Sequence, residues 1–127
     1  MIHIRHGQRQ FVPQVFIKDC FAIAKCPSEG LESPTVVGAQ AANELLNIAG
    51  VKASFVLTPY NNEVYISARA IDEVNVQVLM EKMGGGGHLN IAGAQVKKPM
   101  PEVEEMLKNI IDEMYQEKRK QNESNFY

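Results

Sequence analysis

Hydrophobic and polar positions along the chain change their periodicity several times, and each change predicts an element of secondary structure. Residues 15–26, VFIKDCFAIAKC, are rich in β-branched and aromatic side chains and stop before a proline, which predicts one strand. Residues 51–58 alternate apolar and polar positions, and residues 63–70 do so again after a Pro-Tyr-Asn-Asn turn. Two alternating runs around a short turn predict an antiparallel hairpin.

Three further stretches place apolar residues at helical spacing. The first follows Ser33 and Pro34, which are a typical cap residue and a typical first helical residue. We expect this helix to end at Gly50, because glycine is the common residue just after a helix. Glycine and alanine residues along it make the helix slim enough to pack close to a sheet.

The second predicted helix begins at a cap, Asp72 or Asn75, and ends at the glycine run 84–87. Residues 94–96 then predict a short strand that returns to the sheet. The last predicted helix begins at Pro101, with acidic residues near its start and basic residues near its end, as the helix dipole favours. Its apolar stripe consists of Val103, Met106, Leu107, Ile110, Ile111 and Met114.

The length of 127 residues, with 45% hydrophobic and 22% charged residues, fits one domain around one core. We expect an α/β (α+β) fold, in which helices pack on a mixed central sheet of about four to five strands. The domain is expected at 15–118, with a linker or appended end at 1–14 and a frayed tail at 119–127. His3 and His6 make a poor metal site, because no carboxylate or cysteine lies near them in sequence.

The net charge of -2 provides no general attraction to nucleic acid or to an anionic membrane, so any such contact must be local. No apolar run approaches the ~20 residues that a membrane helix needs, and the N-terminus lacks the apolar region of a signal peptide. Cys20 and Cys26 are expected to be reduced. These features predict a cytoplasmic domain.

The glycine run 84–87 and the histidine after it predict a binding site, because glycine is costly to order without a reason. Successive glycine N–H groups can form a concave anion site, and a histidine can donate a hydrogen bond to a phosphate oxygen. An arginine that ends the polar face of the strand 63–70 can direct two N–H donors at the same phosphate. The predicted phosphate-binding residues are Ser67, Arg69, Gly84, Gly85, Gly86, Gly87, His88 and Asn90.

The same residues allow a simpler interpretation. A glycine after a helix is an ordinary C-cap, and a lone histidine is more often a surface or core residue than a ligand. The run lacks the Gly-Lys-Ser/Thr ending of a Walker loop and the spacing of a GxGxxG motif. Asp19, Asp72 and Asp112 are scattered, so we predict neither a catalytic set nor a metal site. On these residues alone both interpretations stay open, and the chain offers only half of an active site.

Most of the chain resembles a known family. GGGGHLNIAGAQ (84–95), preceded by Ser-Ala-Arg (67–69), is similar to the DHHA1 subdomain of the DHH phosphoesterase superfamily. More narrowly, ISARAIDEVNVQVLMEKMGGGGHLNIAGAQ (66–95) and AQAANELLNIAGVKASFVL (39–57) resemble the C-terminal part of GdpP-type cyclic-di-AMP phosphodiesterases. The resemblance covers residues 15–118.

The resemblance implies a site, a partner and a reaction. In such enzymes an N-terminal DHH domain binds Mn²⁺ through aspartates and histidines, and the DHHA1 subdomain closes over the substrate. Gly84–Gly87, His88 and Arg69 are implied to bind the phosphate or the nucleotide. The implied ligands are cyclic-di-AMP and its hydrolysis product 5′-pApA, and the parent protein can be anchored in a membrane with this domain on the cytoplasmic side.

The chain lacks the Asp-His-His motif and its companion aspartates, so we expect no hydrolysis by this domain alone. Three alternative functions stay open. One is a substrate domain for short oligoribonucleotides or for 3′-phosphoadenosine 5′-phosphate. Another is an RNA- or tRNA-binding module, since DHHA1-like domains also end alanyl-tRNA synthetases. A third is a homodimer formed through the apolar stripe of the last helix.

Overall fold

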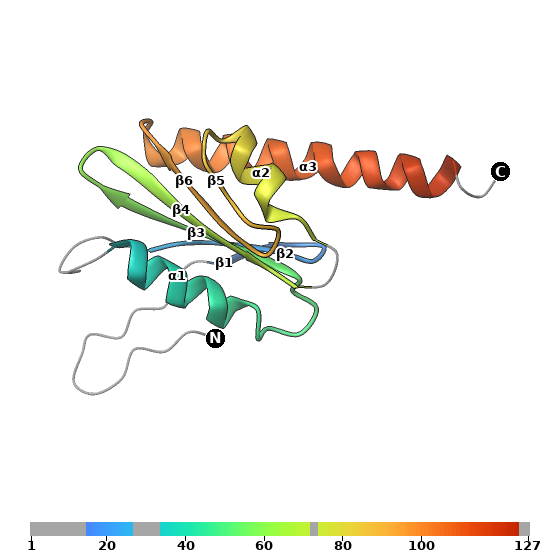
Figure 1. Ribbon diagram of the computed structural model, residues 1–127, viewed down its shortest axis with the longest axis horizontal. Helices are drawn as coiled ribbons and strands as arrows, with labels where there is room; N and C mark the ends of the chain where they lie inside the picture. Colours follow the sequence, from blue (N-terminus) through green and yellow to red (C-terminus); the bar gives the residue numbers. More distant parts are fainter. Residues whose placement is uncertain (1–14, 27–33, 72–73, 125–127) are drawn as a thin grey trace.

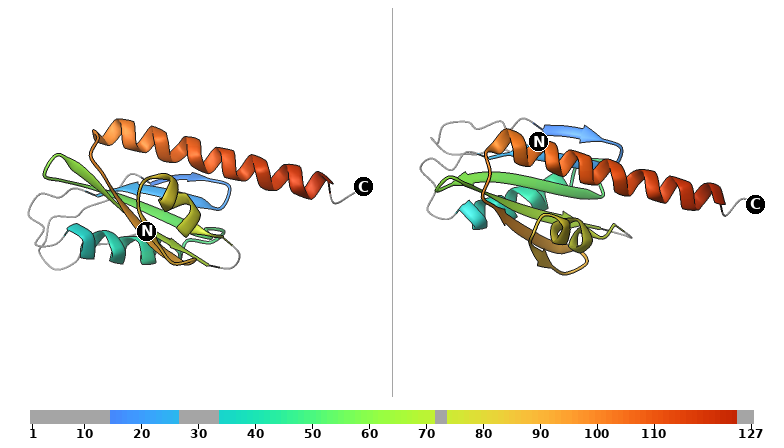
Figure 2. Two further views of the ribbon diagram at one scale, coloured as in Figure 1. Left: turned by 45° about the horizontal axis from the view of Figure 1, so that its top comes forward. Right: turned by 90° about the horizontal axis from the view of Figure 1, so that it is seen from above.

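The computed structural model describes residues 15–26, 34–71 and 74–124, which form a six-stranded sheet between two helical layers (Figure 1). The strand order is β1-β2-β3-β4-β6-β5, and every neighbouring pair is antiparallel except β2 and β3. Helix α1 covers one face of the sheet, whereas α2 and α3 lie on the other (Figure 2). The elements are β1 (Val15–Lys18), β2 (Phe21–Lys25), α1 (Pro34–Leu45), β3 (Ala53–Tyr60), β4 (Glu63–Ala70), α2 (Val76–Lys82), β5 (Gly86–Gly87), β6 (Ile91–Val96) and α3 (Met100–Ser124).

The predicted α+β class, with one domain and a mixed sheet, is confirmed, but the sheet has six strands rather than four or five. One extra strand arises because residues 15–26 form a hairpin, β1–β2, and not the single strand predicted. The chain reverses at Asp19, whose φ of 56° lies in the left-handed region. Aspartate tolerates that region better than most residues, so it permits a two-residue turn within an otherwise strand-like run.

The face under α2 and α3 carries the larger hydrophobic cluster. Along β4 every second side chain, from Val64 to Ala70, is buried in it. The stripe of α3 packs on the same cluster: Val103, Leu107 and Ile111 are buried, and the other three stripe residues lie partly buried against it. This stripe therefore contacts the sheet of its own chain, and the homodimer stays a prediction.

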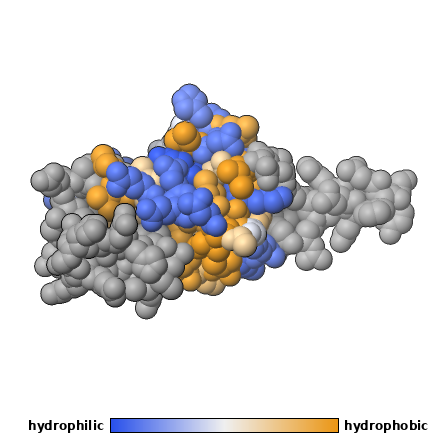
Figure 3. All heavy atoms as spheres, turned by 90° about the horizontal axis from the view of Figure 1, so that it is seen from below, coloured by the Kyte–Doolittle hydropathy of each residue, from blue (hydrophilic) through white to orange (hydrophobic). Residues whose placement is uncertain are grey.

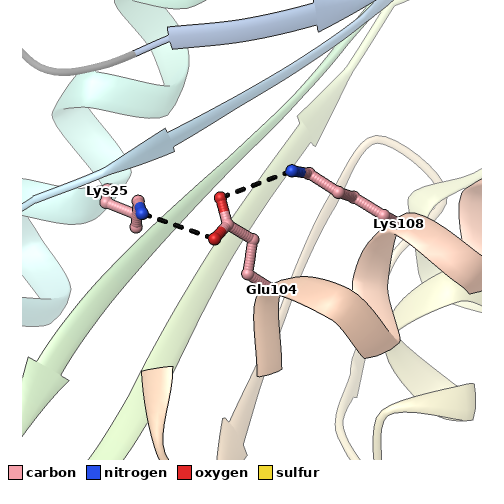
Figure 4. Close-up of polar contacts among 3 residues, drawn as sticks. All are labelled: Lys25, Glu104 and Lys108. Carbon is pink, nitrogen blue, oxygen red and sulfur yellow. Dashed lines mark hydrogen bonds and ion pairs between the residues drawn. The ribbon is translucent and has the colours of Figure 1, made fainter. Parts of the chain in front are cut away.

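Ion pairs add to the packing of α3 on the sheet. Glu104 accepts from Lys25 Nζ of β2 at 3.3 Å and pairs with Lys108 Nζ of its own helix at 3.7 Å (Figure 4). Lys18 at the end of β1 donates to Asp112 at 2.8 Å. All these side chains are partly or largely exposed to water, so the pairs contribute little to stability.

Helix α1 packs on β3 and β4 through smaller residues. Ala22, Ala24, Ala42 and Val56 belong to its cluster, together with Leu45, Val51 and Cys26. A Cβ at Gly38 would lie 3.0 Å from Ser67 Oγ and 3.2 Å from Thr58 Oγ1, which is tighter than most such contacts. The slim helix expected from the sequence therefore approaches the sheet closely.

Several predicted boundaries differ from the structure. Helix α1 ends at Leu45, and turns rather than helix lead to Gly50, whose φ is 87°. Asn75 is the cap of α2, since its Oδ1 accepts from the N–H of Val78 at 3.2 Å. Helix α3 continues to Ser124, within the segment expected to fray.

The interpretations of Ser33, of Asp72 and of residues 1–14 lie outside the described residues. None of the helices in the described part of the chain combines the length and the apolar character that crossing a bilayer requires.

Candidate phosphate-binding site

Two rows of residues cross β4, β6 and β5 on the α1 side of the sheet. In the first, Arg69 of β4 is paired with Ile91 of β6, whose carbonyl accepts from the N–H of His88 at 2.6 Å. In the second, Ser67 pairs with Gly93, which pairs with Gly86. Residues directly opposite each other in a sheet direct their side chains to the same face. The strand register therefore places four of the eight predicted site residues on one surface, namely Ser67, Arg69, Gly86 and His88.

Helix α1 packs on β3 and β4 and does not extend to a comparable degree over β6 and β5. The α1 side of these last two strands is consequently left open by the described residues, and Ile91 is 55% exposed there. Seen from this side, hydrophobic and hydrophilic residues lie next to one another on the described surface (Figure 3). The open surface is thus a mixed polar and apolar one.

Arg69 is the cation of this surface. It is half-buried, and desolvation by burial lowers the pKa of its guanidinium. Its Nη1 donates to the carbonyl of Ala68 at 2.8 Å, and no carboxylate pairs with it among the described residues. A guanidinium has five N–H donors and stays charged at neutral pH. Arg69 therefore presents a partly desolvated positive charge that an anion would neutralise.

His88 and Asn90 belong to the turn between β5 and β6. His88 is exposed and follows the glycine strand directly. The Nδ2 of Asn90 donates to the carbonyl of Ala70 at 3.1 Å, and the N–H of Ala70 donates to the carbonyl of Asn90 at 2.9 Å. Asn90 therefore extends the pairing of β4 with β6, and its role as a ligand stays a prediction.

The first two glycines terminate α2. The N–H of Gly85 donates to Met80 O at 2.8 Å and the N–H of Gly84 to Glu81 O at 3.1 Å, the pair of bonds that defines a Schellman motif. The φ of Gly84 is 87°, as this motif requires. These two N–H groups are therefore used by the helix, so the run does not form the concave anion site of successive N–H groups that the sequence suggested.

Steric contacts separate Gly86 from its neighbours. A Cβ at Gly85 would lie 2.1 Å from the carbonyl oxygen of Gly93, and one at Gly87 would lie 2.5 Å from the Cα of Ala92. A Cβ at Gly86 would meet nothing within 4 Å, and its φ is not in the left-handed region. The fold thus accounts for Gly84 by its positive φ and for Gly85 and Gly87 by close contacts, whereas at Gly86 the missing side chain leaves open space above the sheet.

Sequence reasoning overlooked Gly93 and Ile91. Gly93 is required by the fold, because a Cβ there would lie 2.8 Å from the carbonyl oxygen of Ile66. An isolated glycine in a strand pattern indicates such a close backbone approach. Ser67, which was predicted to bind phosphate, is half-buried and lies beside Gly38 of α1.

A hollow of about 470 Å³ lies at the other end of the sheet, around the β3–β4 turn. Here Glu63 Oε2 accepts from Gln95 Nε2 at 2.8 Å, while Glu63 Oε1 is buried and has no hydrogen-bond partner within the described ranges. Lys98 in its wall pairs with Glu102 at 3.6 Å. Charges of both signs line this hollow, so it does not have the cationic character of the Arg69 surface.

The described residues do not fit a manganese site of their own, since no three His, Cys, Asp or Glu side chains gather among them. The surface around Arg69 and His88 carries hydrogen-bond donors suited to an anion, and its role as a binding site stays a prediction.

The model of the DHHA1 domain family matches residues 19–118. The chain belongs to the DHHA1 domain family. This DHHA1 domain is 48% identical over 86 residues to the cyclic-di-AMP phosphodiesterase PdeA of Listeria monocytogenes, a match that covers 66% of the chain. It is 43% identical over 105 residues to the cyclic-di-AMP phosphodiesterase GdpP of Bacillus subtilis, covering 80% of the chain. The matches span only 13% and 16% of those two relatives.

The fold of this DHHA1 domain also occurs in a solved structure. An exopolyphosphatase-related protein of Bacteroides fragilis superposes with a TM-score of 0.70 at 19% identity, covering 78% of this chain and 31% of the other. At that identity the likeness concerns the fold alone. The expected resemblance to the DHHA1 family is thus confirmed, together with a relationship to cyclic-di-AMP phosphodiesterases.

Proposed function

We propose that this DHHA1 domain binds the phosphodiester of cyclic-di-AMP, or of its linear product 5′-pApA, on the open surface of β4, β6 and β5. The observation that carries the proposal is Arg69, a partly buried cation without a carboxylate partner among the described residues. A charge that has lost part of its water and has no counter-ion gains most from an anionic ligand. A phosphodiester suits its planar donor geometry.

His88 and Gly86 assist in different ways. His88 shares the row of Arg69 and can donate a hydrogen bond to a second phosphate oxygen. Gly86 leaves the neighbouring surface bare, so that a ligand can lie close to the sheet. Ser67 and Asn90 are lesser donors in this proposal, since α1 packs beside the first and the second bonds to Ala70.

We further propose that hydrolysis needs an N-terminal DHH domain of the parent protein, which supplies the Mn²⁺ site. The identity of 48% to a cyclic-di-AMP phosphodiesterase supports this reaction. This chain binds and orients the phosphodiester and is inactive alone, because the described residues include no metal-binding group. The free Cys20 and Cys26 fit a reducing compartment, which supports a location in the cytoplasm.

The test is an equilibrium titration of the chain with 5′-pApA at fixed ionic strength. Arg69→Gln is expected to weaken binding about thirtyfold, since a charge-assisted hydrogen bond in a partly desolvated site is lost. The affinity of Arg69→Lys should lie between those of the native chain and Arg69→Gln, because lysine keeps the charge but loses the bidentate geometry. Lys97→Gln removes an equal charge at the other end of β6 and serves as the matched control.

Native-like binding by Arg69→Gln would contradict the proposal. So would an equal loss in Lys97→Gln, because the attraction would then depend on net charge alone. That second result would favour a polyanion-binding module, whose affinity depends on the number of phosphates neutralised.

A further inference from the structure

The phosphate-binding proposal leaves an exposed apolar side chain unexplained. Ile91 stands between Arg69 and His88 in the row that joins them, and it is 55% exposed. Two more aliphatic side chains border the same end of the ladder, Leu89 at 45% and Ile71 at 41% exposure. Isolated exposed aliphatics are common on protein surfaces, but these three lie near a cation that has no carboxylate partner in the described part of the chain.

The pairing of the backbone explains why these side chains gather. The N–H of Ala70 donates to the carbonyl of Asn90, which places the residue after Ala70 beside the residue before Asn90. These two residues are Ile71 and Leu89, and both lie two residues beyond the pair of Arg69 with Ile91 along their own segments. The apolar group therefore belongs to the same local structure as the cation.

Open space adjoins Ile91 on the side of the glycine strand. The second row contains Gly93 and Gly86, so two strands carry no side chain next to Ile91 on this face. A Cβ at Gly86 would meet no atom within 4 Å. A flat group of a ligand could therefore lie on bare sheet backbone and contact the methyl groups of Ile91 at its edge.

We propose that Ile91 receives the nucleobase of the bound ligand and so makes this surface selective for nucleotides over phosphates without a base. The proposal rests on the proposed function, because Arg69 must hold the phosphate for the base to reach Ile91. Neighbouring strands lie about 4.8 Å apart, which is within the reach of a base joined through ribose to that phosphate. Inorganic phosphate and polyphosphate have no apolar face to place there.

A ligand explains this surface better than a protein partner does. An apolar protein surface laid on Ile91 would also cover Arg69 and leave its charge buried, unless the partner supplied a carboxylate. A nucleotide brings the negative charge and the apolar ring in one molecule. The charge of Arg69 therefore favours the nucleotide as the occupant.

The test compares two ligands that differ only in the base, AMP and ribose 5-phosphate, titrated separately into the chain. We expect AMP to bind about tenfold more tightly, the size of effect that covering part of one aliphatic side chain produces. Ile91→Thr keeps a β-branched residue in the strand and should abolish most of this preference. Binding of ribose 5-phosphate should stay within about twofold of native, since its contacts with Arg69 are unchanged.

Ile17→Thr is the matched control, because Ile17 is 49% exposed on β1 at the opposite edge of the sheet. It should retain the preference for AMP. Equal binding of the two ligands by the native chain would overturn the role of Ile91 and leave the phosphate site standing. A preference that survives in Ile91→Thr would also overturn it. If neither ligand binds at millimolar concentration, both the phosphate site and the base contact are wrong.

Discussion

The two faces of the sheet are closed to different extents. On the face of α2 and α3, side chains of all the larger strands join one hydrophobic cluster with both helices. On the opposite face α1 covers β3 and β4 and leaves β6 and β5 largely open. The strand β4 belongs to both faces: Val64, Ile66 and Ala68 are buried in the cluster, whereas Ser67 and Arg69 are half-buried on the other side.

This difference shows how one strand can serve stability and binding at once. Because side chains alternate along a strand, the closed face can be filled with apolar residues while the other face of the same strand carries a cation. Closing both faces completely would bury Arg69 at a cost, and opening both would remove the core. Variants on the closed face should therefore change stability, and variants on the open face should change binding.

The largest effect on stability is expected from Leu107→Ala on the closed face. Leu107 is fully buried between α3 and the sheet, so its truncation leaves a cavity and should lower the free energy of unfolding by about 3–4 kcal/mol. Denaturant unfolding measures the loss. The folded fraction should still bind 5′-pApA with native affinity. A parallel loss of affinity would contradict the claim that the closed face determines stability and the open face binding.

The glycine run provides a matched pair for the next prediction. Gly85→Ala should lower the free energy of unfolding by about 3 kcal/mol, because its Cβ would collide with the backbone of β6. Gly86→Ala should leave stability within about 0.5 kcal/mol of native, since its Cβ meets nothing. It should nevertheless weaken 5′-pApA binding about tenfold by filling the space above the sheet. Native-like binding by a folded Gly86→Ala would show that the ligand does not lie on Gly86.

Ser54 and Thr58 test the polar contacts under α1. Ser54 Oγ donates to the carbonyl of Ala42 at 2.6 Å, near the end of α1, and both residues are fully buried. Ser54→Ala should therefore destabilise the domain by about 1–2 kcal/mol. Thr58 Oγ1 is buried without a hydrogen-bond partner among the described residues, so Thr58→Val should be close to neutral. Equal losses in thermal or denaturant unfolding would contradict this contrast.

Arg69→Gln also tests the difference between the two faces through the free energy of unfolding. Burial lowers the pKa of Arg69, which means that the folded state binds this proton less tightly than the unfolded state. The charged side chain therefore opposes folding at neutral pH, and the variant should be at least as stable as the native chain. Unfolding in denaturant measures this, and a clear destabilisation would indicate that Arg69 has a structural role.

The smallest effect is expected from His88→Gln. Glutamine retains a hydrogen-bond donor but places it differently from the imidazole N–H groups, so binding of 5′-pApA should weaken about threefold. An equilibrium titration measures the difference. An unchanged affinity in a folded His88→Gln would indicate that His88 does not contact the phosphate.

The sequence predicted well those elements whose pattern is local. The hairpin of β3 and β4 follows from alternation on both sides of one turn. For the cap of α2 the sequence indicated Asp72 or Asn75, and the structure has Asn75. The β1–β2 turn was missed because it depends on the left-handed backbone of Asp19 within a continuous strand-like run. Strand β5 was missed because two glycines have no hydrophobic pattern.

For the candidate site, the sequence suggested residue types but not their geometry, and the binding role of these residues stays a prediction. Arg69 and His88 were predicted because cationic and imidazole groups beside glycines are typical of phosphate sites. The pairing of Gly86 with Gly93 and the exposure of Ile91 depend on strand register, which no local pattern contains. The Schellman bonds of Gly84 and Gly85 depend on where α2 ends.

The most direct measurement of the central claim is an amide NMR titration of the chain with 5′-pApA and, separately, with cyclic-di-AMP. We predict shifts centred on Arg69, Gly86, His88 and Ile91, with little change at the hollow around the β3–β4 turn. Shifts centred instead on that hollow, from Tyr60 to Glu63 and at Lys97, would place the ligand at the other end of the sheet and contradict the account.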